Sequence, residues 1–174
     1  MASILIIPLV IGLAITGPIG GVLSDKYGSR ILSTIGLIIS LVGLLGLATM
    51  HYNTPYWILA TWMFINSFGS GLFQAPNTSA IMSSVPPERR GVASSLRAFF
   101  NSAGMVLSMG IAFPLIIGTI SITEMMDMFV VGGANMPVAV QEAFTAGITN
   151  AFILSSILTV PAIIVSAMRG KNRD

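Results

Sequence analysis

The charged residues of this chain gather in a few short segments, and one of them, GVLSDKYGSR at residues 21–30, lies between two long apolar runs. It places one carboxylate, Asp25, beside two basic side chains, Lys26 and Arg30, in a chain of which only 8% of residues are charged. These residue types form hydrogen bonds and ion pairs, but they do not make the nucleophile–base pair that covalent catalysis needs. A short charged turn of this kind can hold neighbouring helices together and release them when they move. We therefore interpret Gly21, Asp25, Lys26, Gly28 and Arg30 as a conformational latch.

Each residue of this candidate latch has an expected physical role. Gly21 should let two helices approach closely, and Gly28 should make a tight reversal with positive φ. Asp25 is expected just ahead of a helix start, where it can accept backbone N–H groups. Lys26 and Arg30 can pair with Asp25 or with lipid phosphates. The alternative is a simple basic turn that orients the chain in a membrane.

A second set of polar residues lies in an otherwise apolar stretch. Asn66, Ser70, Gln74 and Asn77 follow one another at steps of 4, 4 and 3, so they share one face of a helix. Neighbouring glycines and Pro76 would let this helix bend. We predict that the face lines a transport pathway; the alternative is hydrogen bonding between helices alone.

Arg97 is the third candidate, at the start of another apolar stretch. Its side chain either reaches back to the membrane surface or pairs with an acidic residue on a helix outside this chain. Gly17 and Gly21 form a GxxxG pair, which favours close helix packing.

The elements that must position these residues are membrane-spanning helices. The chain has 174 residues, is 54% hydrophobic and has a mean hydropathy of +0.89. Uncharged stretches of about 20 residues are long enough to cross about 30 Å of hydrocarbon as helix. The runs do not alternate polar and apolar residues, which excludes barrel strands. We predict an all-α integral membrane bundle of about five spans, at residues 3–23, 31–50, 57–83, 92–119 and 146–168.

Lysine and arginine predict the orientation of the bundle. All eight lie in the first connection, around the third connection or in the tail, so five spans place them on one side. The positive-inside rule makes that side cytoplasmic, with the N-terminus outside and the C-terminus inside. Membrane orientation accounts for the basic residues, so we expect no nucleic-acid partner. An odd number of helices beginning outside suggests the last part of a longer protein.

Absences in the sequence limit the mechanism. There is no cysteine, no zinc ligand set and no GxxxxGK[ST] motif, so we expect no metal, no cofactor and no nucleotide-driven pump, and we expect no enzyme. No Asp or Glu lies within the five predicted spans. A proton-coupling carboxylate would therefore lie in sequence outside this chain.

Residues 21–30 resemble the signature loop of the major facilitator superfamily, which runs glycine, any, leucine, small, aspartate, basic, any, glycine, basic, basic. Only Ser29 departs from it. The resemblance implies that the chain corresponds to the last five helices of a transporter, most of one six-helix half. Residues 69–112 are also similar to the late region of the fourteen-helix drug:proton antiporters, through Gly69, Gly71, Phe73, Pro76, Asn77, Pro86, Arg90, Gly91, Ala93 and Ser94.

The resemblance implies a secondary active transporter in the cytoplasmic membrane, exporting multiple drugs by proton antiport through alternating access. Its partners would be amphipathic or cationic drug-like molecules, protons, the lipid bilayer and the missing N-terminal helices of the same transporter. The alternatives are a facilitator for sugars or other metabolites, and a membrane scaffold or truncated product that transports nothing.

Overall fold

The structure, a computed structural model, describes residues 6–118, 121, 123, 126, 130 and 137–168; of Asp25 it describes the backbone alone. Every regular element in these residues is a helix, which confirms the predicted all-α class. The elements are α2 (Ile7–Tyr27), α3 (Ser29–Leu47), α4 (Tyr56–Ser83), the 3-10 turn η1 (Pro87–Arg89), α5 (Arg90–Ile117) and α7 (Val138–Met168).

Each predicted span corresponds to one long helix, but the helices differ in how apolar they are. By length and composition, α2, α3, α5 and α7 could each cross a membrane. The third predicted span, 57–83, forms α4, whose 28 residues are long enough. Its asparagine, serine and glutamine side chains lower its hydropathy, so α4 is not among the helices that are apolar enough to cross a membrane. The assignment of α4 as a span therefore rests on its length and its position in the bundle, while its composition is that of a partly polar helix.

Helix α7 begins earlier than the sequence suggested. The predicted start was residue 146, whereas the helix begins at Val138 and has 31 residues. At 1.5 Å per residue it is about 46 Å long, well beyond the hydrocarbon thickness of about 30 Å. Glu142, expected in a loop, lies exposed in the first turns of this helix. The extension, VAVQEAFT, is mostly apolar but contains Glu142, and a span predicted from an uncharged run begins after the charged residue.

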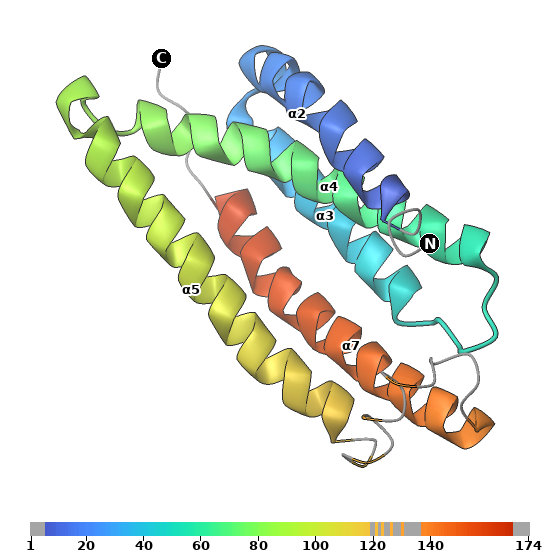
Figure 1. Cartoon of the computed structure of the whole chain (residues 1–174). Coiled ribbons are helices and arrows are strands. Elements are labelled where there is room, and N and C mark those ends of the chain that lie inside the picture. Colours follow the sequence, from blue (N-terminus) through green and yellow to red (C-terminus); the bar gives the residue numbers. More distant parts are fainter. Residues whose placement is uncertain are drawn as a thin grey trace.

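The helices are arranged around α3 and α4 (Figure 1). α4 packs against both α2 and α3, α3 also packs against α7, and α5 packs mainly against α7. None of the described α5 residues is buried. The α2–α3 corner, η1 and the end of α7 all lie at one end of the bundle (Figure 1).

Glycines set the distance between α3 and α4. A Cβ atom added at Gly36 would lie 2.6 Å from the backbone nitrogen of Phe73, and one added at Gly43 would lie 2.5 Å from that of Asn66. Such distances leave no room for any side chain. Small residues at interfaces of this kind let membrane helices approach backbone to backbone.

The GxxxG pair in α2 behaves differently. A Cβ added at Gly17 or at Gly21 would meet nothing within 4 Å. The closely packed glycines of α2 are instead Gly12, against Ser67, and Gly20, against Ala75. The expected close packing at Gly17 and Gly21 is therefore wrong for contacts within the described part of this chain, because these two residues lie on another face of the helix.

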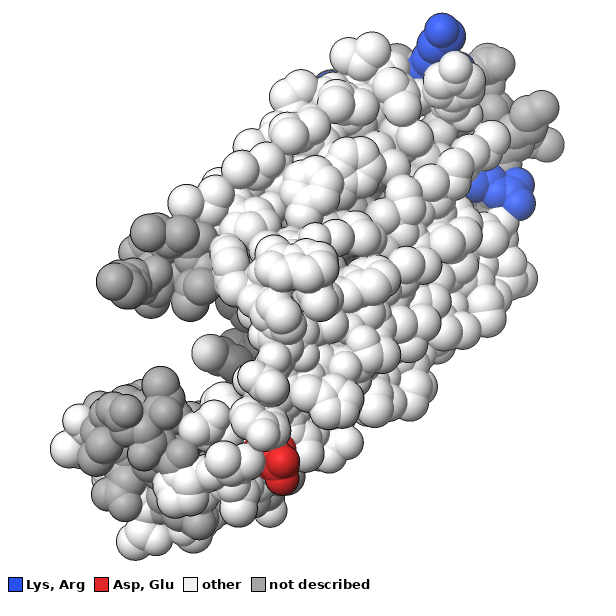
Figure 2. All heavy atoms as spheres, turned by 90° about the vertical axis from the view of Figure 1, so that its right-hand side faces the viewer, with Lys and Arg blue, Asp and Glu red and all other residues white. Residues whose placement is uncertain are grey.

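Charge is segregated along the bundle. Basic side chains lie at one end of the space-filling view and an acidic one lies towards the other (Figure 2). Lys26 and Arg30 belong to the α2–α3 corner, and Arg89 and Arg90 to the α4–α5 corner at the same end. This arrangement agrees with the predicted grouping of the basic residues on one side.

The α3–α4 contact predicts a position-specific stability effect. Gly36→Val should destabilise the folded chain by about 1–3 kcal/mol, the usual cost of overpacking. Gly110→Val in α5 is the matched control, because a Cβ atom added there meets nothing within 4 Å. Thermal unfolding of the two variants in detergent, followed by circular dichroism, measures the difference. Equal unfolding temperatures would contradict the packing described here.

Candidate functional site

The α2–α3 corner turns on a single residue. α2 ends at Tyr27 and α3 begins at Ser29, so Gly28 alone makes the reversal, with φ 85° and ψ 144°. Its N–H donates to the carbonyl of Ser24 at 2.9 Å and closes the last turn of α2. No other described residue has a positive φ. The predicted conformation of Gly28 is confirmed, and glycine is the residue that tolerates it.

Asp25 does not precede a helix start. It lies in the last turn of α2, and the N-cap of α3 is Gly28, with no side-chain hydrogen bond. The expected capping position was wrong because the turn is one residue long, so α2 continues past Asp25. A carboxylate near the C-terminal end of a helix faces the negative end of its dipole. The side chain of Asp25 lies outside the described part, and its latch role stays a prediction.

The two basic residues of the corner have different contacts. A guanidinium nitrogen of Arg30, Nη2, donates to the backbone carbonyl of Ala167 in the last turn of α7. Lys26 is exposed, with its Nζ 5.6 Å from the ring centroid of Tyr27. Arginine at the C-terminal end of a helix satisfies a free carbonyl and opposes the negative dipole end. Arg30 therefore joins the signature segment to the last helix of the chain.

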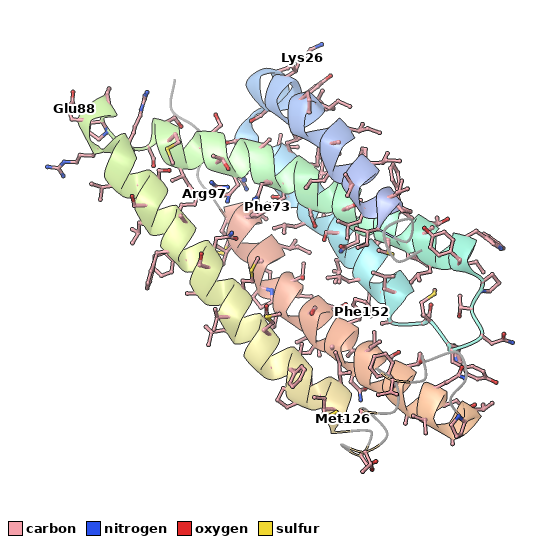
Figure 3. The ribbon with its side chains drawn as sticks, in the orientation of Figure 1. Lys26, Phe73, Glu88, Arg97, Met126 and Phe152 are labelled. Atoms are coloured by element: carbon pink, nitrogen blue, oxygen red, sulfur yellow. The ribbon has the colours of Figure 1, made fainter. Side chains whose placement is uncertain are left out.

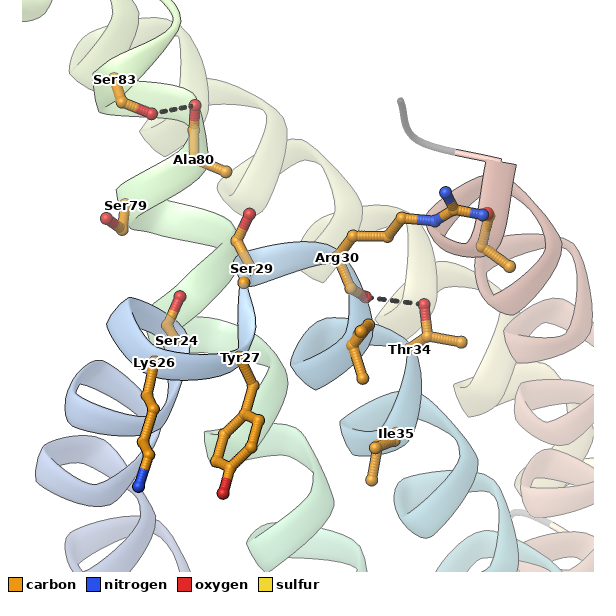
Figure 4. Close-up of a pocket in the computed structure, with 13 residues that line it drawn as sticks. Ser24, Lys26, Tyr27, Ser29, Arg30, Thr34, Ile35, Ser79, Ala80 and Ser83 are labelled. Atoms are coloured by element: carbon orange, nitrogen blue, oxygen red, sulfur yellow. Dashed lines mark hydrogen bonds between the residues drawn. The ribbon is translucent and has the colours of Figure 1, made fainter. Parts of the chain in front are cut away.

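A second contact strengthens this connection. Thr34 Oγ1 lies 3.0 Å from Ser166 Oγ. Thr34 is one helical turn beyond Arg30 on α3, and Ser166 is next to Ala167 on α7. Thr34 already donates its hydroxyl proton to the carbonyl of Arg30 at 2.9 Å (Figure 4). Ser166 must then be the donor between the two hydroxyls. Sequence reasoning missed Thr34, Ser166 and Ala167, since nothing local links residues more than a hundred positions apart.

The predicted polar face of α4 is divided between two environments. Asn66 Nδ2 donates to the carbonyl of Ser40 at 3.2 Å and to its Oγ at 3.0 Å. The hydroxyl of Ser70 lies 3.2 Å from the same Oγ. Asn66 and Ser70 are therefore engaged with α3, as the alternative of interhelical hydrogen bonding anticipated.

Gln74 is placed differently. It is exposed and lines a groove of about 540 Å³ between α2 and α4, together with Thr78 and Gly17. Asn77 is half-buried on the same helix. An exposed amide beside an apolar groove can bind a polar group of a substrate or of another helix, so the pathway-lining role stays a prediction carried mainly by Gln74.

Ser40, the centre of the hydrogen bonds to α4, was not singled out from the sequence. A signal was present in its spacing, because Ser29, Ser33, Gly36, Ser40 and Gly43 recur at steps of 4, 3, 4 and 3. This is the repeat of one helix face. All five are buried, and the stripe marks the α3 face that α4 covers.

Arg97 lies about two turns into α5 and is half-buried. Figure 3 shows it on the side of α5 that faces α7. This placement keeps the cation away from the most exposed face of the helix. Its predicted roles, reaching the membrane surface or pairing with an outside acid, are not distinguished by this geometry.

The sequence of this chain is similar to sequences of a known protein family. The sequence profile of the Major Facilitator Superfamily matches residues 1–170. The chain belongs to the major facilitator superfamily. No solved structure matches this facilitator chain.

Several curated relatives of this facilitator chain carry transport or resistance names. Multidrug resistance protein 3 of Bacillus subtilis is 34% identical over 110 residues, which cover 63% of this chain and 22% of the relative. The riboflavin transporter RibZ of Clostridioides difficile is 32% identical over 101 residues, 58% of this chain and 22% of the relative. The methyl viologen resistance protein SmvA of Salmonella typhimurium is 28% identical over 110 residues, with 63% and 22% covered. In each case the matched region is about a fifth of the relative's length.

The contact between α3 and α7 can be tested by cross-linking, since the chain contains no cysteine. The pair Thr34→Cys/Ser166→Cys should form a disulfide on mild oxidation, because the two hydroxyl oxygens lie 3.0 Å apart. Thr34→Cys/Ser156→Cys is the control, with the second cysteine nearly three helical turns away on α7. Mobility on non-reducing gels after protease cleavage between α3 and α7 measures the bond. Equal cross-linking of both pairs would contradict the α3–α7 packing.

Proposed function

We propose that this chain is the C-terminal transmembrane bundle of a secondary active transporter. It would export amphipathic or cationic small molecules by proton antiport, through alternating access of two helix bundles. The fourteen-helix drug:proton antiporter branch is the proposed group within the superfamily. The corner that contains Lys26 and Arg30 would face the cytoplasm, as the positive-inside rule favours.

The observation that carries this proposal is the exposed amide of Gln74 above the α2–α4 groove. Uncompensated polar groups in hydrocarbon are costly and tend to mark pathways or helix contacts. Ser70 and Asn66, one and two turns away from Gln74, hold α4 on α3 through hydrogen bonds to Ser40. The α4 wall of the groove is therefore fixed to a neighbouring helix. A flat amide beside small and apolar residues suits varied ligands, which supports a drug-type substrate range. The names of two relatives favour the same range.

The corner supplies the conformational part of the proposal. Arg30 and Thr34 connect the start of α3 to the end of α7, while Gly28 makes a turn to α2 that is one residue long. A connection of this kind would move α2, α3 and α7 together at their cytoplasmic ends. In this proposal the coupling carboxylate belongs to helices outside the predicted spans of this chain.

A transporter of one metabolite is the second candidate, and the similarity to a riboflavin transporter favours it. A planar, hydrogen-bonding metabolite would also suit an amide above an apolar groove. A membrane scaffold that transports nothing is the remaining alternative, and it would need no exposed amide at Gln74.

The proposed activity predicts efflux that depends on a proton gradient. Cells producing the whole gene product that includes this chain should expel a cationic dye, and a protonophore should stop the efflux. Dye accumulation and riboflavin export are measured side by side. Efflux that persists after the gradient collapses would overturn proton antiport. Riboflavin export alone would favour the second candidate, and a correctly inserted protein with neither activity would favour the scaffold.

The α4 face predicts two different phenotypes. Gln74→Ala should change transport of a preferred substrate about fivefold, the effect of one hydrogen bond of about 1 kcal/mol, at unchanged yield. Asn66→Ala should lower the yield of folded protein, because it removes two contacts to Ser40. Thr61→Ala, an exposed change on the same helix, is the control. The pathway role of Gln74 fails if its replacement alters yield alone.

A further inference from the structure

A pocket of about 870 Å³ lies beside the α2–α3 corner (Figure 4). The start of α3 forms one wall, Lys26 and Arg30 belong to its lining, and Ser79 and Ser83 of α4 lie across from them. Both charged side chains described in this lining are cations. The pocket lies at the end of the bundle that contains the α2–α3 corner and the end of α7.

The first turn of α3 adds donors to this pocket. Ser29, Arg30 and Ile31 all line it, and the N–H groups of a first helical turn have no carbonyl partner within the helix. The cap residue Gly28 has no side chain and makes no side-chain cap bond. A helix start combines unused donors with the positive end of the dipole, and it therefore favours an anion.

An independent observation comes from Ser29. Its side chain is 5% exposed and its Oγ has no hydrogen-bond partner in the described part of the chain. Two other hydroxyls of the lining are already engaged, since Ser83 donates to the carbonyl of Ala80 and Thr34 to that of Arg30. Figure 4 shows Ser29 directed from the start of α3 toward α4. A buried hydroxyl without a partner costs about 1–3 kcal/mol, and a ligand oxygen reached by rotation about χ1 would remove that cost.

We infer that this pocket binds a phosphate group, held by the α3 N-terminus, Lys26, Arg30 and the hydroxyl of Ser29. The guanidinium of Arg30 has five donors, of which the bond to Ala167 takes one, so it can hold the phosphate and α7 together. Binding depends on the two cations and the helix start together. The phosphate comes from a phospholipid headgroup or from free inorganic phosphate.

The purified chain in detergent micelles tests the site with two probes, phosphatidylglycerol and inorganic phosphate. Thermal unfolding across a titration of each probe measures affinity, because a ligand of the folded state raises the unfolding temperature. Lys26→Gln should weaken binding about fivefold, the effect of about 1 kcal/mol per basic residue at a membrane surface. Arg97→Gln is the matched control, a basic residue outside the pocket, and should leave the affinity unchanged.

Ser29→Ala keeps the test decisive if the charge variant folds poorly. Without a probe it should raise the unfolding temperature, because it removes an unpaired buried hydroxyl; with a probe it should weaken binding about fivefold. Stabilisation by phosphatidylglycerol alone identifies a headgroup site, and stabilisation by both probes identifies a general phosphate site. The inference is overturned if neither probe binds, if Lys26→Gln and Ser29→Ala leave the affinity unchanged, or if Arg97→Gln lowers it equally.

Discussion

The contact of the α3 backbone with the α4 backbone is the constraint on which the other contacts depend. Helices in lipid gain little from burying apolar surface against each other, so close packing and hydrogen bonds must hold them. Gly36 and Gly43 bring the two backbones together. At that distance Ser40, which lies between the glycines, reaches both Asn66 and Ser70. Unpaired polar groups of α4 would be costly in hydrocarbon. The close approach of the two backbones gives Asn66 and Ser70 a hydrogen-bonding partner in Ser40.

From this pair the rest of the bundle follows in sequence. α2 packs on the other side of α4, and α7 packs on the free side of α3. α5 has no buried residue and packs mainly on α7, so its place depends on contacts made two helices away. Arg30 and Thr34 join α7 to the start of α3. They therefore attach α7, and α5 with it, to the pair that α3 forms with α4.

The α2–α3 corner combines rigidity with unused binding capacity. A one-residue turn at Gly28 leaves α3 to start abruptly, with free N–H groups and no side-chain cap. Arg30 uses part of its guanidinium on α7, and the hydroxyl of Ser29 is buried without a partner. The connection of α3 to α7 through Arg30 and the inferred phosphate site are consistent with each other. An anion bound here would add contacts to a corner that Arg30 already joins to α7.

The sequence by itself determined the features that depend on residues close together in the chain. Long apolar runs predict helices, Gly28 predicts the positive φ, and the positions of lysine and arginine predict which connections share a side. The signature segment 21–30 also led to the correct superfamily. These features follow from backbone geometry and from the cost of placing charge in hydrocarbon, and both are local properties.

Only the tertiary structure decided which partner each polar side chain has. It placed Asp25 inside α2, joined Arg30 to Ala167, separated Gln74 from Asn66 and Ser70, and left Gly17 and Gly21 without close neighbours. Helical spacing shows which residues share a face, but the neighbour of that face depends on the way helices distant in sequence pack together. That choice is made by shape and hydrogen bonding between helices, for which a single sequence contains no local signal.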